Sequence, residues 1–427
     1  RFKQYVRFKP DIKLKYVYYY DTIQSLSQDQ RFPEMNTEQR AKEIMRIHGL
    51  DSNIFLRPEQ IREQIDLSGE KNMFVRLLER ENGEKTFLRV FDDMLHHPGE
   101  AEITAAFKRI AMELPTVGFL IGHGERDINR TGDREYSGFA LEKKFRYALI
   151  NQGFDVLNVS LTDEIPDNIK ILVIAEMKEP LTETEEINLE HYIARGGNLF
   201  ITCEPKRSEV MNILLEKFGV RLVAGTLVQL TENFSPDLIV AKPSQEATKL
   251  NYYFDEMKQN NRSLVMSGAA GLEYDGKSGY NVIPLFMCDS LAWNEVETTN
   301  FVDERPVLSV SMGEIQKPYA TVLALSREIN NKEQKIMILG DADCISNGEL
   351  SMHRRGISAS NYTIIMGGFY WMSDNEVPID VRRPTPPDNV IYLNEAEIGT
   401  WQVLMTWILP GILLMISIFI WIRRRGR

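Results

Sequence analysis

The chain contains few residues of the kinds that build metal or redox centres, with only three cysteines and six histidines in 427 residues. Cys203, Cys288 and Cys344 lie far apart, and no two have the spacing of a zinc site or of a redox Cys-x-x-Cys motif. An odd, sparse set also gives no disulfide framework, so the redox compartment is left open. We expect neither a metal nor another cofactor.

An excess of positive charge is also missing. The chain carries 50 basic and 61 acidic side chains, which gives a net charge of −11 and a pI near 5.3. Binding to nucleic acid requires a basic surface, so nucleic acid is not expected as the main partner. Aromatic and basic residues do alternate over residues 1–21, but a lysine-bearing edge strand explains that pattern more simply.

Long hydrophobic runs are lacking until the C-terminus. Leu404–Ile422 has no charged residue and is long enough to cross a bilayer, with tryptophans near its ends. Four arginines follow among residues 423–427, and the positive-inside rule places them in the cytoplasm. We therefore predict a Pro-rich linker over residues 379–400, a transmembrane helix over 401–423 and a cytoplasmic tail over 424–427.

The remaining length suffices for two domains. Because the chain starts at Arg1 rather than Met, we expect it to be a piece of a longer polypeptide. Residues 1–113 combine a helix over Thr37–Ile47, a hairpin around Asn82-Gly83 and a helix over Glu100–Leu114. This pattern predicts a small thioredoxin-like α/β domain, without the redox cysteines.

The second domain, over residues 114–378, is organised around the stretch TVGFLIGHGE at Thr116–Glu125. An apolar run of strand length ends there in glycines, as in a strand buried on both faces. Helical patterns separate the later runs, among them one over residues 138–152 and one with a Thr182/Glu185 capping box. This order predicts a doubly wound, flavodoxin- or glutamine-amidotransferase-like, mostly parallel sheet. The later core strands are expected at Val156–Val159, Ile169–Ala175, Asn198–Cys203 and Lys335–Gly340.

Residues 220–327 are predicted to form a β-rich insertion or antiparallel extension of this sheet. A strand over Tyr319–Ser326 is expected to pair with Lys335–Gly340 as a hairpin, and Asn361–Met372 to form the closing helix. The other candidate strands are Leu227–Leu230, Leu238–Ala241, Leu264–Met266, Val282–Met287 and Val307–Val310.

Polar side chains follow several of the predicted core strands. Because the carboxyl ends of parallel strands meet at one edge of a sheet, we expect these side chains to converge there. The expected form is an open, solvated, acidic cleft that accepts a polar ligand or a basic loop of a partner. The candidate ligand-binding residues are His123, Gly124, Glu125, Glu204, Asp341, Asp343 and Asn347.

Each candidate also has a simpler interpretation. His123 and Glu125 have the chemistry of an acid–base pair, but a tight glycine turn explains them as well. Asp341 and Asp343 suit Mg²⁺ or Ca²⁺, although such residues after a strand more often cap a turn. Cys203 lacks the flanking glycines of a nucleophile elbow. No catalytic residue is therefore assigned.

Four stretches together resemble one family. They are the GHGE loop at 122–125, EPLTETEEINLEHYIARGGNLFITCE at 179–204, the GDADCISN loop at 340–347, and the terminal helix with its arginines at 404–425. Their order resembles the GldG-type auxiliary subunits of ABC transporters, first associated with gliding motility. The α/β domain also resembles the GIFT domain, which an intraflagellar transport protein shares and which is proposed to bind sugars.

The resemblance implies a non-catalytic accessory subunit that acts with a permease and an ATPase, with a carbohydrate or peptide as candidate ligand. It implies anchoring in the bacterial inner membrane, with the bulk of the chain on the periplasmic side, and it admits a permease fused upstream of Arg1. The alternative is an extracytoplasmic hydrolase on a glutamine-amidotransferase-like sheet. The missing nucleophile elbow argues against that alternative.

Overall fold

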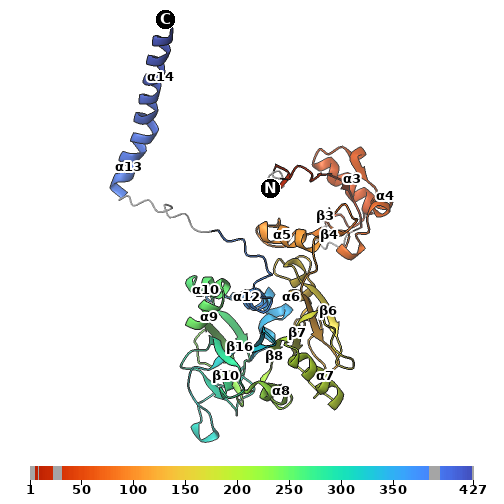
Figure 1. The fold of residues 1–427 in the computed structure, drawn as a ribbon, viewed down its shortest axis with the longest axis vertical. Coiled ribbons are helices and arrows are strands. Elements are labelled where there is room, and N and C mark those ends of the chain that lie inside the picture. The colour runs from red at the N-terminus through yellow and green to blue at the C-terminus, as the bar shows by residue number, and fades with distance from the viewer. Residues whose placement is uncertain (1–4, 8, 23–30, 384–394, 426–427) are drawn as a thin grey trace. The chain divides into compact units, whose positions relative to one another are not determined.

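The computed structural model describes residues 5–7, 9–22, 31–383 and 395–425 (Figure 1). The chain separates into two compact units, residues 1–380 and residues 381–427. The second unit begins two residues after the start of the predicted Pro-rich linker, half of which lies outside the described residues.

Among the described residues, the largest sheet has 11 strands and is parallel in one half and antiparallel in the other. The parallel half has the order β6-β5-β7-β8-β17, and every neighbouring pair in it is parallel. With its strands numbered along the chain, this is the order 2-1-3-4-5 of flavodoxin-like sheets. The fold class is thus confirmed. The bounds are β5 Thr116–Leu120, β6 Asp155–Val159, β7 Ile169–Ala175, β8 Asn198–Thr202 and β17 Lys332–Leu339.

Both faces of the parallel half are covered, which explains why its strands read as continuous apolar runs. Alternate residues of β5 and β7 enter two different cores, so that Val173 lies in one and Leu172 in the other. Helices α6 (Ser137–Leu141) and α12 (Tyr362–Met372) contribute to the first core. Helices α7 (Glu183–Ala194) and α8 (Ser208–Leu215) contribute to the second.

The antiparallel half is the predicted β-rich extension. Strand β16 (Ala320–Ile329) pairs with β17 through a turn at Asn330-Asn331, where both residues have positive φ, 50° and 62°. This is the geometry that favours asparagine in a two-residue hairpin. The other elements are β9 Val220–Leu222, β11 Leu238–Pro243, α9 Gln245–Leu250, α10 Tyr252–Gln259, β12 Leu264–Ser267, β13 Leu272–Tyr274 and β14 Asn281–Met287, with β10 Thr226–Val228 and β15 Trp293–Glu295 as a separate pair.

Two sequence predictions within this domain are wrong. Residues 307–310 form no strand, and a short 3₁₀ turn begins at Val310 instead. The helix expected over residues 138–152 is reduced to α6 and a 3₁₀ turn at Leu149–Asn151. The side chain of Asn151 donates to the carbonyls of Glu142, Lys143 and Phe145, so side-chain hydrogen bonds replace the helical ones.

The first 113 residues contain two small sheets. Strands β1 (Tyr18–Tyr19) and β2 (Phe55–Leu56) are parallel, whereas β3 (Arg76–Glu79) and β4 (Lys85–Leu88) form the expected hairpin. Among the described residues these pairs do not join into the single sheet of a thioredoxin-like unit, so that finer prediction is not met. The helices described there include α3 Thr37–Ile47, α4 Pro58–Gln64 and α5 Glu100–Arg109.

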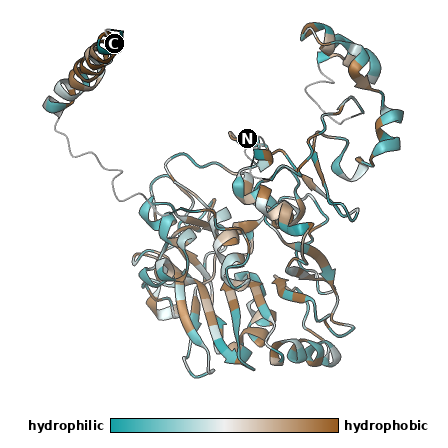
Figure 2. Ribbon diagram, turned by 45° about the horizontal axis from the view of Figure 1, so that its top comes forward, coloured by the Kyte–Doolittle hydropathy of each residue, from teal (hydrophilic) through white to brown (hydrophobic). Residues whose placement is uncertain are grey.

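The described part of the second unit contains a continuous apolar helix over Glu397–Arg425, in which an 18-residue window has a mean hydropathy of 2.5. It consists of α13 (Glu395–Val403), a π-helical turn at Leu404–Ile408 and α14 (Leu409–Arg425). The π turn precedes Pro410, whose ring clashes with the preceding helical turn and whose nitrogen cannot donate. The helix is long and apolar enough to cross a membrane, and most of its ribbon has the colour of hydrophobic residues in Figure 2.

Candidate functional site

The site lies at the carboxyl edge of the parallel strands and is centred on Arg126. Strand β5 ends in the predicted glycine loop, in which Gly124 has a φ of 75°. This backbone conformation favours glycine, and a Cβ there would also approach the Lys178 side chain to 3.1 Å and displace it slightly. Arg126 follows directly, and its amide donates to the carbonyl of Ala175 at the end of β7. It is therefore held at the junction of β5 and β7, where the strand order reverses.

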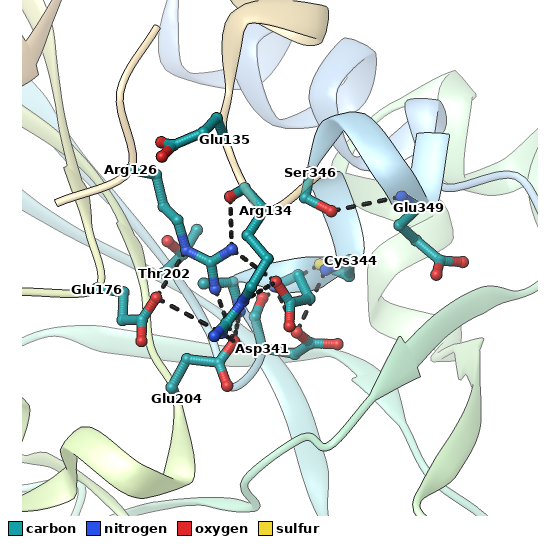
Figure 3. A network of polar contacts seen from close by, with 12 residues as sticks. Arg126, Arg134, Glu135, Glu176, Thr202, Glu204, Asp341, Cys344, Ser346 and Glu349 are labelled. Carbon is teal, nitrogen blue, oxygen red and sulfur yellow. Dashed lines mark hydrogen bonds and ion pairs between the residues drawn. The ribbon is translucent and has the colours of Figure 1, made fainter. Parts of the chain in front are cut away.

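The Arg126 guanidinium donates hydrogen bonds to acids that follow three different strands (Figure 3). Its Nε donates to Glu176 at 2.6 Å, after β7, and its Nη2 to Glu204 at 3.1 Å, after β8. Its Nη1 donates to Asp343 at 2.6 Å, after β17, and to the carbonyl of Arg134. Arg126 is only 4% exposed, so these are charge-assisted hydrogen bonds in the protein interior.

Arg134 supplies a second cation on the solvent side. Its Nε donates to Asp343 at 3.1 Å, and its Nη2 lies 3.7 Å from Glu204 and 3.8 Å from Glu176. Its side chain is 61% exposed, so it contributes little stability compared with Arg126. Figure 3 shows Arg126 and Arg134 pointing toward the same group of acids.

Two carboxyl groups of the site have raised pKa values. Burial, together with the neighbouring Asp343 and Glu176, raises the pKa of Glu204 to about 7. Burial also raises the pKa of Asp341, which is fully buried, and the charges of Glu204 and Asp343 add to this effect. The guanidinium groups therefore offset only part of the negative charge.

Glu204, Asp341 and Asp343 lie together, with one carboxylate oxygen of each within 4.8 Å of the others. In each of them one oxygen takes the hydrogen bonds. Oε1 of Glu204 accepts from Arg126 and from the Ala342 amide, and Oδ1 of Asp341 accepts from the amides of Asp343 and Cys344. Oδ2 of Asp341 is buried and has no hydrogen-bond partner among the described residues.

His123 and Glu125 form a separate cluster at the same edge. Nδ1 of His123 lies 3.1 Å from Glu125, and its Nε2 lies 3.2 Å from Glu185 in the first turn of α7. Glu125 also accepts from the His123 amide at 2.7 Å. The side chains of His123 and Glu125 are nearly buried, so they fasten the loop to α7.

Asn347 has a structural role. Its Oδ1 accepts from the Gly138 amide at 2.6 Å, and its Nδ2 donates to the carbonyl of Gly132 at 2.8 Å and to the hydroxyl of Ser137. It thereby holds the loop that carries Arg134 against the end of β17. Both the oxygen and the nitrogen of its amide are therefore engaged within the fold.

The structure corrects the expectation of an open acidic cleft. Glu204 and Asp341 are buried, with exposures of 7% and 0%, and arginine side chains lie among the acids. The sequence analysis missed Arg126, although it is the next residue after the GHGE loop. Electrostatics could have pointed to this arginine. Several carboxylates predicted at one buried edge require a cation or protons.

No activated nucleophile is present in the described residues of this site. Burial raises the pKa of Cys203 and of Cys344, so both thiols remain protonated and unreactive. His191 lies on the exposed surface of α7, 3.5 Å from Glu164, rather than beside a thiol or hydroxyl. The arrangement suits binding and ion pairing rather than covalent catalysis.

The model of a family described as an ABC-type uncharacterized transport system matches residues 114–363, more than half of the 427-residue chain. No curated protein is significantly similar to the chain. Among solved structures, the mmIFT52 N-terminal domain is 16% identical, with 61% of this chain and 98% of that chain covered and a TM-score of 0.42. A ThuA-like protein from Parabacteroides merdae is 11% identical, with 65% and 94% covered and a TM-score of 0.31. At these TM-scores neither likeness supports an inference about function.

Proposed function

Since the chain belongs to this family of ABC-type transport-system proteins, we propose that it is a non-catalytic accessory subunit of a GldG-type transporter, anchored by its C-terminal helix. The family match carries this proposal, because it covers the whole parallel sheet and the acid cluster. The subunit acts together with a permease and an ATPase. The buried, protonated thiols of the site agree with a role that requires no catalysis.

We further propose that the sheet domain lies on the periplasmic side of the bacterial inner membrane. The arginines at 423–425 directly follow the apolar helix, and the positive-inside rule assigns such a cluster to the cytoplasm. The β5/β7 edge then presents its polar residues to periplasmic ligands. A carbohydrate or a segment of a partner protein fits this edge, since flavodoxin-like sheets bind ligands where the strand order reverses.

Co-purification tests the accessory role. The full-length chain, extracted in mild detergent with an affinity tag, should retain a permease and an ATPase that mass spectrometry identifies. Removal of the chain should abolish transport, whereas Cys203→Ala should leave it intact. Loss of transport in a normally folded Cys203→Ala protein would support the hydrolase alternative instead.

Cysteine labelling tests the orientation. The three native cysteines are buried, so an added cysteine gives a specific signal. Thr162→Cys, at an exposed position of the sheet domain, should react with an impermeant maleimide applied to the periplasmic face. Gly426→Cys, beyond the apolar helix, should react only after the membrane is permeabilised. The reverse pattern would contradict the proposed topology.

A further inference from the structure

Glu204, Asp341 and Asp343 use their carboxylate oxygens unequally. The bonds to Arg126 and to backbone amides fall on Oε1 of Glu204 and on Oδ1 of each aspartate. The second oxygen of Asp341 is buried without a hydrogen-bond partner among the described residues. A buried polar atom that lacks a partner is costly, and in a native site it calls for an ion, a water or a ligand.

The spacing of the three carboxylates limits what this partner can be. One oxygen from each lies within 4.8 Å of the others. Oxygens bound to one Ca²⁺ at 2.3–2.6 Å lie at most about 5 Å apart, whereas those around Mg²⁺ lie at most about 4.2 Å apart. The limit of 4.8 Å lies within the span of one Ca²⁺ coordination sphere, so a single Ca²⁺ can reach one oxygen of each carboxylate.

The charge balance also favours a cation. Four carboxylates, those of Glu176, Glu204, Asp341 and Asp343, lie beside three arginines. Arg207 is 3.8 Å from Glu176 through its Nε, and the other two guanidinium groups are those of Arg126 and Arg134. Arg126 and Arg134 both contact Asp343 through Oδ1, so its second oxygen is not engaged by them. The side chain of Asp343 is 28% exposed and gives the cluster a route to solvent, from which waters can complete the coordination.

We propose that Glu204, Asp341 and Asp343 form a binding site for one divalent cation of the Ca²⁺ type, with Asp341 as its buried ligand. The cation joins the ends of β8 and β17, which carry Glu204 and Asp341. Arg126 and Arg134 hold the outer oxygens and orient the acids, and they do not coordinate the ion. The site goes beyond the accessory role, because it requires neither a permease nor an ATPase.

Equilibrium binding to the full-length, detergent-purified and metal-stripped chain tests the site. Radiolabelled Ca²⁺ should bind with a stoichiometry of one per chain and a Kd at or below roughly 10⁻³ M, the weak end of extracellular calcium modules. Mg²⁺ should compete only weakly. The melting temperature should rise with Ca²⁺ concentration, since the ion binds only the folded chain.

Three variants make the assignment specific. Asp341→Asn and Asp343→Asn should each weaken Ca²⁺ binding by about tenfold or more, because each loses a charged ligand. Glu209→Gln, an exposed position in the first turn of α8, removes one charge outside the cluster and should leave the affinity unchanged. Arg134→Gln should tighten Ca²⁺ binding, because it removes a positive charge from beside Glu204 and Asp343.

Two outcomes would overturn the proposal. One is no saturable Ca²⁺ binding by the folded wild-type chain up to several times the roughly millimolar limit. The other is wild-type affinity in both aspartate variants, which would place the bound ion elsewhere. Far-ultraviolet circular dichroism of each variant establishes that it is folded, and Asp343→Asn provides the decisive result if Asp341→Asn does not fold.

Discussion

Buried carboxylates occur in two parts of the sheet domain, and they are satisfied in different ways. At the strand edge, Glu176, Glu204 and Asp343 share the guanidinium of Arg126 and that of Arg134, and Asp341 beside them retains an oxygen without a partner among the described residues. In the β-rich extension, Glu295 and Glu314 are equally buried, at 2% and 0% exposure, and neither forms an ion pair with a described residue.

Backbone amides take the place of cations in the extension. Glu295 accepts from the amides of Glu297 and Thr298 and from the Trp293 indole. Although burial alone raises the pKa of Glu295, these hydrogen bonds hold it below its ordinary value. Glu314 accepts from the amides of Val296 and Ser309 through its two separate oxygens. Acids whose oxygens are all used hold a loop in place, whereas an acid with an unused oxygen marks a binding site.

The largest expected effect is the loss of Arg126. In Arg126→Met, Glu176 and Glu204 remain buried without their main cation, which should destabilise the chain by about 3–5 kcal/mol. Urea denaturation measures this loss. Arg130→Met removes an exposed arginine four residues away and should cost less than about 1 kcal/mol. Equal stabilities of the two variants would show that Arg126 is not the organising cation.

The second effect concerns the loop held by Glu314. Glu314→Ala leaves the amides of Val296 and Ser309 without acceptors, at a cost of about 1–3 kcal/mol for each buried group. Hydrogen exchange should accelerate over residues 296–309 and remain slow in the parallel strands. Glu304→Ala changes an exposed acid in the same loop and serves as the control. If the amides of residues 296–309 exchange as slowly in Glu314→Ala as in the wild type, Glu314 does not hold this loop in place.

A smaller effect is expected for Asp341→Asn in metal-free buffer. The amide oxygen keeps the acceptor for the Asp343 and Cys344 amides, and the buried carboxyl charge is lost. Stability should therefore change by less than about 1 kcal/mol, in contrast to Arg126→Met. A loss as large as that of Arg126→Met would mean that Asp341 supports the fold rather than a ligand.

The smallest expected effect concerns Glu70 and the stability of the chain at acidic pH. Glu70 is buried, and both of its oxygens are used by Arg89 and Lys143. Burial opposes its ionisation, but these two cations outweigh it and hold the pKa of Glu70 below its ordinary value. Its stabilising contribution is thus present above the unfolded pKa and is lost as the pH falls through the lower folded pKa. Glu70→Gln should therefore make stability fall less steeply between about pH 5 and pH 3. An unchanged pH profile would contradict a lowered pKa of Glu70 in the folded chain.

Much of the fold could be predicted from local pattern. Apolar runs marked the core strands because a strand buried on both faces needs them throughout its length. Two asparagines marked the β16–β17 turn because they tolerate positive φ. The predictions failed where side-chain hydrogen bonds overrode the local pattern, as at residues 138–152, where the Asn151 side chain occupies the carbonyls of an expected helix.

For the candidate site, too, one part could be predicted from the sequence and another part could not. The sequence by itself determined that Glu204, Asp341 and Asp343 follow parallel strands, and hence that they share one edge of the sheet. Only the tertiary structure decided that Arg126 lies among them, since its contacts with Glu176 and Asp343 span 50 and 217 residues. Periodicity is a local property of the chain, whereas the burial and neutralisation of a charge depend on every element packed around it.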